Sequence, residues 1–501
     1  MSMTRDAFRP YTDAETFERI VEYDSVTEMW AKCLAEFADR PAIEDDGKTY
    51  TFARLEQDAA SVRAALSGLG LQKGDRVGLL APNSYDFVKS YLGIVTAGFV
   101  CVALPPHLDE MTVFGCTMKY ALKAVLVHPA LEEKTAFAKT HGSRSVFLST
   151  TLPEASCPMA EGLKAEDPCV MLFTGGTTGK SKGALLSHGN VLQGTVNGCY
   201  GYKEVFGQRY MLVLPLTHVF GLVRNLMTSL YTGSDLFIVR NNKDMFRDAA
   251  MFRPTIMVMV PALAEMCLQL GKKFGRNMLG ESMKTIIAGA AVVPPYLVNE
   301  YDKLGVLLLP GYGLTESANL VSGNPESLKK PESVGLPFPN QELKVVNGEL
   351  LLRGKNMMIG YVGEEEASYD EDGWFHTGDL VRFDEEGFLY ITGRTKEIIV
   401  LPTGENISPA EMETRFNELV CVQDTQVFED LNERGEHILA LEALPRMTEL
   451  QGVEDVKAYV TAELQKVNES FPLFMRVSRI EIRDQDFERT PSMKIKRYHR
   501  V

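Results

Sequence analysis

Three features are absent from the sequence, and each absence excludes a class of protein. No run approaches 18 uncharged apolar residues, and the N-terminal stretch MSMTRDAFRPYTDAETF has no apolar segment, so we expect neither a membrane span nor a secretory signal. The eight cysteines form no C-x-x-C pair and have no histidine partners at zinc spacing, so we expect reduced thiols in a cytoplasmic protein. A basic excess is also missing: the net charge of −15 argues against nucleic acid as a partner.

What is present indicates a multidomain α/β protein. At 501 residues, with 45% apolar and 24% charged residues, the chain is too long for one ordinary core, so we expect two or three domains. Short apolar runs, such as 76–80, 100–104 and 285–288, alternate with helical patterns, which is typical of a parallel sheet with helices on both faces. After residue 330 short β-type runs predict a β-rich subdomain, and the last hundred residues alternate like a small α+β domain.

The stretch 172–184, LFTGGTTGKSKGA, holds the densest group of phosphate-binding residue types. Glycines let backbone N–H groups approach a ligand, while threonine hydroxyls and lysine ammonium groups complement phosphate oxygens. We interpret it as a triphosphate-binding loop; the alternative is a Gly-Thr-rich surface turn. A P-loop is rejected, because the pattern needs a glycine where this sequence has Thr174.

Two further turns follow expected strands, where ligands of open α/β sheets bind. The first is 288–291, AGAA, whose small residues leave room for a flat ring, although small residues after strands are common. The second is 311–317, GYGLTES, in which Tyr312 can lie against adenine, Thr315 can donate to a phosphate and Glu316 can bind Mg²⁺. A strand-to-helix turn capped by Thr315 or Ser317 is the alternative.

Together these segments resemble the adenylate-forming superfamily, and within it the acyl-CoA synthetases and aryl-acid ligases. TGGTTGKSKG at 174–183 resembles the superfamily's phosphate loop, with Gly175 where serine is commonest and Ser181 where proline is usual. GYGLTE resembles Y-G-x-T-E, TGD at 377–379 resembles the family's T-G-D, and GRTKE at 393–397 resembles G-R-x-x-[DE]. TPSMKIKR at 490–497 resembles T-P-S-G-K-[IL]-x-R, with Met493 in place of glycine.

The resemblance implies ATP-dependent activation of a carboxylic acid to an acyl-adenylate, with release of pyrophosphate, followed by thioester formation. ATP, Mg²⁺ and coenzyme A are the implied cofactors, and a small-molecule carboxylic acid is the implied substrate. Loading of a carrier protein's phosphopantetheine arm is an alternative, as are an oxidase of luciferase type and a catalytically silent binding protein. Either a monomer or a homodimer is compatible with the sequence.

The same resemblance implies roles for individual residues. Lys494, Thr315 and Lys182 are expected at the reaction centre, with Glu316 as the metal ligand. Asp379 and Arg394 are expected to bind ribose or phosphate. The full set expected to bind the nucleotide is Thr174, Gly175, Gly176, Thr177, Thr178, Gly179, Gly289, Ala290, Ala291, Tyr312, Glu316, Asp379 and Arg394.

The acid pocket and the domain boundary are also implied. His218 and Gly313 are expected beside the acid, although His218 could instead be an ordinary core histidine. Arg224 is interpreted as the partner of a surface carboxylate, with an acidic or hydroxylated substituent of the acid as the alternative. Residues 1–394 are expected to form the large domain and 395–501 a small mobile domain, with Lys396 as the hinge. Pro402 and Thr403 replace the commoner small residues of the thiol tunnel, which leaves the acceptor open.

Overall fold

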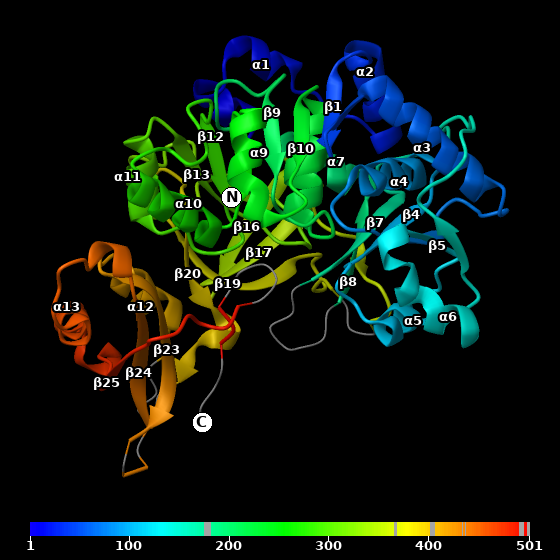
Figure 1. The fold of residues 1–501 in the computed structure, drawn as a ribbon. Coiled ribbons are helices and arrows are strands. Elements are labelled where there is room, and N and C mark those ends of the chain that lie inside the picture. The colour runs from blue at the N-terminus through cyan, green and yellow to red at the C-terminus, as the bar shows by residue number, and fades with distance from the viewer. Residues whose placement is uncertain are drawn as a thin grey trace.

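The structure is a computed structural model that describes residues 1–174, 182–364, 368–400, 406–432, 434–435, 437–489 and 495–497. Two mixed sheets form the centre of the large part of the molecule, with helices packed around them (Figure 1). The predicted α/β class, with a large N-terminal domain of parallel and mixed sheets, is therefore confirmed.

The first sheet has the strand order β15-β14-β13-β12-β11-β9-β10-β1-β2, and its central strands are parallel. Their parallel carboxyl ends place the turns after β12 and β13 at one edge. Its strands are β1 (Pro41–Asp45), β2 (Lys48–Thr51), β9 (Arg209–Leu212), β10 (Asp235–Ile238), β11 (Ile256–Met259), β12 (Thr285–Ala288), β13 (Leu307–Tyr312), β14 (Ser322–Gly323) and β15 (Leu336–Pro337).

The second sheet has the order β18-β8-β7-β4-β3-β5-β6. Strands β3 to β7 run parallel where they pair, whereas β8 and β18 are antiparallel additions at one edge. Its strands are β3 (Arg76–Leu80), β4 (Val100–Leu104), β5 (Ala124–Val127), β6 (Val146–Ser149), β7 (Pro168–Phe173), β8 (Gly183–Ser187) and β18 (Gly360–Tyr361).

The helices follow the sequence signals closely. Helix α2 (Val26–Phe37) begins where the Ser25 side chain accepts the Glu28 N–H, and its apolar residues at helical spacing are buried. Helix α7 (His188–Asn197) begins at Ser187 with a capping box that Asn190 completes. Helices α3 (Phe52–Ser67) and α4 (Tyr85–Thr96) also form within a few residues of the expected bounds.

A third, antiparallel sheet has the order β16-β17-β19-β20 and forms the β-rich subdomain that the sequence predicts. Strands β16 (Gln341–Val346) and β17 (Glu349–Gly354) are joined by Asn347 and Gly348, both at positive φ, as the type I′ signal indicated. Strands β19 (Phe375–Phe383) and β20 (Leu389–Arg394) complete it.

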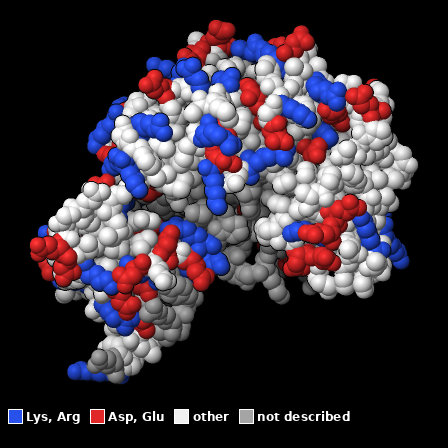
Figure 2. Space-filling view, viewed as in Figure 1, with Lys and Arg blue, Asp and Glu red and all other residues white. Residues whose placement is uncertain are grey.

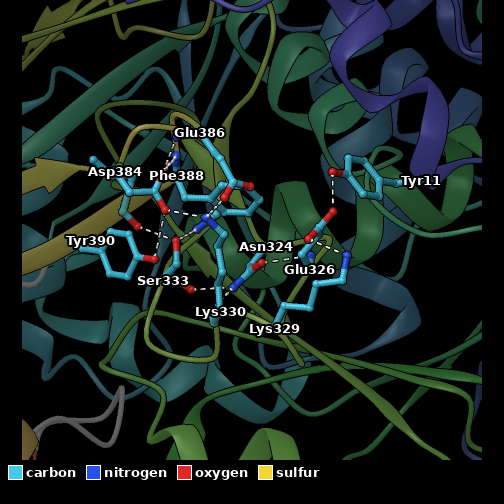
Figure 3. A network of polar contacts seen from close by, with 12 residues as sticks. Tyr11, Asn324, Glu326, Lys329, Lys330, Ser333, Asp384, Glu386, Phe388 and Tyr390 are labelled. Carbon is cyan, nitrogen blue, oxygen red and sulfur yellow. Dashed lines mark hydrogen bonds and ion pairs between the residues drawn. The ribbon is translucent and has the colours of Figure 1, made fainter.

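A polar network ties this subdomain to distant parts of the chain (Figure 3). Lys330 donates to Asp384 at 2.6 Å, and Asp384 also accepts the backbone N–H groups of Glu386 and Phe388. On the other side, Tyr11 of the N-terminal segment donates to Glu326 at 2.9 Å. The segment between β14 and β15 is thereby held both to the N-terminus and to the β19–β20 connection.

The C-terminal part has an apolar core of its own, built from residues between Ile399 and Val477 and separate from the cores of the large part. It contains the sheet β23-β24-β25 and two longer helices, and it lies beside α10 and α11 in Figure 1. The elements concerned are α10 (Pro261–Phe274), α11 (Pro295–Asp302), α12 (Pro409–Phe416), β23 (Val422–Leu431), β24 (His437–Pro445), α13 (Val456–Ser470) and β25 (Arg479–Ile482).

Polar side chains join the two parts. Lys272 of α10 pairs with Glu449 at 2.8 Å, and the Arg446 guanidinium lies 3.2 Å from Glu265 and 4.3 Å above the Tyr296 ring. Figure 2 shows that the molecular surface is hollowed between the two parts and that Lys and Arg are interspersed with Asp and Glu over this face. Within the described ranges, every helix is too short or too polar to cross a bilayer.

Candidate active site

The ends of the predicted phosphate loop lie side by side. Strands β7 and β8 are antiparallel, so the loop joins the two strands of a hairpin. The Thr174 N–H donates to the Lys182 carbonyl at 2.9 Å. A P-loop leads from a strand into a helix, so this hairpin agrees with the rejection of that motif. Gly175, Gly176, Thr177, Thr178 and Gly179 lie outside the described residues.

The Lys182 side chain lies next to β18, which the sequence did not connect with the phosphate loop. Its ammonium nitrogen lies 5.0 Å from the centre of the Tyr361 ring and 3.9 Å from the Glu364 carboxylate. The Tyr361 hydroxyl in turn donates to the side chain of Glu316, the predicted metal ligand. Tyr361 therefore contacts two expected site residues that are 134 positions apart, and it was missed because a lone tyrosine carries no motif.

Three predicted nucleotide-binding residues form one compact cluster. Asp379 of β19 and Arg394 of β20 are direct cross-strand partners, and the Arg394 Nε donates to the Asp379 carboxylate at 2.7 Å. The other carboxylate oxygen accepts the Tyr312 hydroxyl at 2.5 Å. The T-G-D motif leads to the expectation that Asp379 lies on a tight turn, whereas it lies within β19, directly after Gly378 at φ 71°.

Charge and burial reinforce this cluster. The Asp379 side chain is 7% exposed, and the Arg394 side chain is 38% exposed, so one side of the pair is open to a ligand. Burial by itself would lower the pKa of Arg394, but the charges of Asp379 and Glu397 and the hydrogen bond to Asp379 together outweigh this effect, and the pKa is raised. Burial, together with Asp379, raises the pKa of Tyr312, so its hydroxyl remains a donor.

The small-residue turn after β12 meets the turn after β13. A side chain at Gly289 would lie 2.9 Å from the Gly311 carbonyl, and Ala290 has a left-handed φ of 66°. Backbone strain of this kind is concentrated at ligand sites. Gly289 is buried, Ala290 half-buried and Ala291 exposed.

Gly313 was predicted to border the acid, and the structure gives it a packing requirement. A Cβ there would lie 1.2 Å from the Asn319 carbonyl oxygen, so no other residue fits. Thr315 and Glu316 follow in a half-buried turn, and the Met358 N–H donates to the Glu316 carbonyl at 2.8 Å.

His218 precedes a helix that the sequence did not predict. Residues Phe220–Met227 form a π-helix, a rare conformation that is frequent at functional sites. His218 is half-buried, and its carbonyl accepts the Leu222 N–H at 2.9 Å. The Phe220 ring lies 3.5 Å from the position that a Gly289 Cβ would occupy, so the helix starts beside the predicted adenine turn.

Arg224 of this helix differs from its preferred interpretation. The side chain is buried at 2% exposure, so a surface carboxylate cannot be its partner. Its acceptor in the structure is the Tyr202 hydroxyl, 3.3 Å from Nη2.

Lys494 lies outside the described residues, but its neighbours are anchored near the cluster. Arg489 and Ile495 form an antiparallel bridge, and Arg497 pairs with Glu397 at 3.0 Å. Glu397 is three residues beyond Arg394. Lys396, the predicted hinge, lies in the short 3₁₀ turn Thr395–Glu397, and its side chain is outside the description.

Glu316 fits a magnesium site in which the protein supplies a single carboxylate ligand. Within the described ranges no three His, Cys, Asp or Glu side chains converge on a metal position, so the protein would offer few ligands. Mg²⁺ in nucleotide sites typically takes one or two carboxylates plus phosphate oxygens, and a single glutamate fits that pattern.

Comparison with known proteins assigns the family. Residues 30–362 match the model described as AMP-binding enzyme. The long-chain-fatty-acid–CoA ligase of Escherichia coli O157:H7 is 31% identical over 453 aligned residues, covering 78% of this chain and 80% of the relative.

Solved structures share the fold. An anthranilate CoA ligase in complex with anthranoyl-AMP has a TM-score of 0.82 at 21% identity, covering 99% of this chain and 97% of its own. An o-succinylbenzoate CoA synthetase from Bacillus subtilis, bound to its acyl-adenylate, has a TM-score of 0.78 at 22% identity, covering 95% and 98%. The chain therefore belongs to the AMP-binding enzyme family and is an AMP-forming acid–CoA ligase.

Proposed function

We propose that the cluster at β13, β19 and β20 binds the nucleotide while the β7–β8 loop holds its β- and γ-phosphates. The observation that carries this proposal is the convergence of Tyr312, Asp379 and Arg394 through hydrogen bonds of 2.5 and 2.7 Å. These residues come from separate motifs, and an open Arg394 side chain beside a buried carboxylate suits a ribose with neighbouring hydroxyl groups.

In the first half-reaction the acid's carboxylate oxygen attacks the α-phosphorus, and pyrophosphate leaves with the bonding electrons. Both reactants are anionic, so charge neutralisation and positioning supply most of the rate enhancement. Thr174 and Lys182 would bind the outgoing phosphates, Thr315 would donate to the α-phosphate, and Lys494 would bridge the α-phosphate and the acid. Mg²⁺ held at Glu316 would offset the remaining phosphate charge.

The adenine ring would lie between Tyr312 and the turn Gly289, Ala290 and Ala291. His218 would lie beside the reacting carboxylate, because it precedes the helix that starts at this turn. In the second half-reaction a thiol attacks the acyl carbon and AMP leaves.

We further propose that residues 1–394 and 395–501 act as two domains about a hinge at Lys396. Separate apolar cores and polar contacts between the parts support this division, because polar interdomain interfaces generally permit relative motion. Arg497, paired with Glu397, would couple the Lys494 segment to the hinge.

The acid differs among the relatives. The E. coli relative is named for long-chain fatty acids, and the two structures are named for anthranilate and o-succinylbenzoate. The chemistry of this chain's own pocket therefore has to identify the acid class.

Acid-dependent exchange of labelled pyrophosphate into ATP tests the adenylation proposal directly. A panel of aliphatic and aromatic acids should give exchange with at least one acid, and omitting the acid should abolish it. Adding CoA should then produce a thioester and AMP. Exchange without a CoA thioester, but with transfer to phosphopantetheine on a carrier protein, would instead support the carrier-loading alternative.

A further inference from the structure

Arg224 is a buried cation without a carboxylate partner. Its Nη1 atom has no hydrogen-bond partner, and Nη2 reaches the Tyr202 hydroxyl at 3.3 Å. Within the part of the chain that the structure describes, no Asp or Glu forms an ion pair with it. Arginine keeps its charge in proteins, and a buried charge without a counterion is strongly unfavourable. A negatively charged group of a ligand could supply the counterion that Arg224 lacks.

The groups around the guanidinium are neutral. Tyr202 and Tyr210 lie beside it, with their hydroxyls 3.3 Å apart, and burial raises the pKa of Tyr202. Burial also raises the pKa of the nearby Cys199 thiol to about 12. None of these three neighbours therefore neutralises the charge of the guanidinium.

The π-helix connects this position with the reaction centre. It starts with Phe220 beside Gly289, at the carboxyl ends of the parallel strands, and it packs against β9 and β11. Farther along it, the Asn225 amide donates to the Met211 carbonyl at 3.5 Å, and Arg224 reaches Tyr210, the second residue of β9. The helix therefore crosses the sheet from its ligand-binding edge towards its amino edge.

The distance from the level of Arg224 to the carboxyl edge of the sheet follows from strand geometry. From Tyr210 to Val213, just past the carboxyl end of β9, three residues span about 10 Å at roughly 3.3 Å each. Beyond the guanidinium, Tyr202 borders a surface cavity of about 350 Å³ at the amino edge of the sheet. The Tyr202 side chain thus separates the guanidinium from solvent on that side.

We infer that Arg224 forms a subsite for a second carboxylate of the acid, about 10 Å from the carboxylate that is activated. The preferred substrates are then dicarboxylic acids of medium length. This inference rests on the proposed function, because it assigns the distal end of the same acid pocket. A carboxylate there would occupy the open Nη1 of the guanidinium, as arginine and carboxylate groups do in charge-assisted pairs.

The test compares α,ω-dicarboxylic acids of six to ten carbons with monocarboxylic acids of equal length, in pyrophosphate–ATP exchange with the full chain. The wild type should favour the best diacid over its monoacid by at least tenfold in kcat/KM. Arg224→Met should reverse this preference and change the ratio about 100-fold, because a site built for a polar group rejects the analogue that lacks it.

Arg63→Met provides the matched control. Arg63 is equally buried, donates to Thr96 and the Cys157 carbonyl, and pairs with Glu56. None of these partners belongs to the π-helix, so this substitution should lower both activities together. Monomethyl esters of the diacids test the wild type without any variant, and they should behave as the monoacids do.

The outcomes separate the two proposals. Exchange with monoacids in preference to diacids, or an unchanged ratio in Arg224→Met, would overturn the subsite and leave acid adenylation standing. No exchange with any acid, including aromatic ones, would overturn the proposed function and this inference with it.

Discussion

The nucleotide cluster and the contact between the two parts are both built from charged side chains, but they are held very differently. In the cluster, Asp379 is buried and receives hydrogen bonds from Arg394 on the neighbouring strand β20 and from Tyr312 on β13 of another sheet. At the contact, Lys272 and Glu449 pair across separate apolar cores, and both side chains remain partly exposed. The difference indicates that the proposed ligand cluster is fixed inside one part, while the exposed Lys272–Glu449 pair can be exchanged at small cost. The Arg446–Glu265 pair of the same contact is largely buried and belongs to the more firmly held type.

The largest expected effect comes from the lysine that the C-terminal part would contribute. Lys494→Ala should reduce adenylate formation at least 100-fold, because a lost transition-state donor typically costs about 3–4 kcal/mol. Pyrophosphate release with trapping of the adenylate measures this step. Lys496→Ala is the control: its ammonium group lies 3.5 Å from Glu488 and is 54% exposed, so near-normal rates are expected. Equal rates in both variants would remove Lys494 from the mechanism.

Breaking the buried cluster should have the next largest effect. Asp379→Ala leaves the Tyr312 hydroxyl and the Arg394 guanidinium without their acceptor, which should cost about 1–3 kcal/mol of unfolding free energy and raise the KM for ATP at least tenfold. Urea unfolding and initial rates measure both quantities.

Asp384→Ala separates an effect on stability from an effect on ATP binding, because Asp384 lies in the connection between β19 and β20. Asp384 accepts Lys330 and two backbone N–H groups in the network of Figure 3, so stability should fall while the KM for ATP stays close to wild type. A KM that rises equally in both variants would show that Asp379 acts only through stability.

Tyr361→Phe tests the link between the phosphate loop and Glu316. It removes the hydrogen bond to Glu316 but keeps the ring beneath Lys182, and a hydrogen bond to a charged group is worth about 1.5–3 kcal/mol. We expect at least a tenfold loss of activity at low Mg²⁺, partly recovered at high Mg²⁺. Tyr361→Leu, which also removes the ring, should lose more and recover less; identical Mg²⁺ dependence in all three proteins would contradict this role.

The smallest effect is expected at the contact between the two parts. Lys272→Ala should change the ratio of thioester formation to adenylation by no more than about fivefold, because exposed ion pairs contribute about 0.2–1 kcal/mol. The matched variant is Lys329→Ala, which breaks an exposed pair with Glu326 inside the large part and should leave the ratio unchanged. A loss of thioester formation above tenfold would show that this contact is required rather than exchangeable.

Local signals in the sequence predicted most elements. Strands β3, β4, β5 and β12 have the expected bounds, because short apolar runs between turn residues admit few alternatives. The division into two sheets was not predictable, since pairing depends on contacts between distant segments. The π-helix was also missed, but for a local reason: its i→i+5 bonding has no sequence pattern of its own.

The site was predictable where a motif carried it. Tyr312, Asp379 and Arg394 were each assigned from separate motifs, and the structure brings them together. Tyr361 and the buried state of Arg224 required coordinates, since neither residue differs in sequence from an ordinary strand tyrosine or a surface arginine. The roles of all these site residues remain predictions from the resemblance, and the loop residues 175–179 and Lys494 also lie outside the described residues.

The cross-strand pairing of Asp379 with Arg394 ties substrate recognition to the alignment of one hairpin. The irregularity between Leu380 and Val381 sets that alignment, and successive side chains of a strand point to opposite faces. Deleting Leu380 would bring Asp379 opposite Gly393 instead of Arg394, so the carboxylate and the guanidinium would point to opposite faces while every strand could still form. A protein altered in this way could therefore fold, yet lose the ribose contact proposed for this pair through a change in which neither residue is touched.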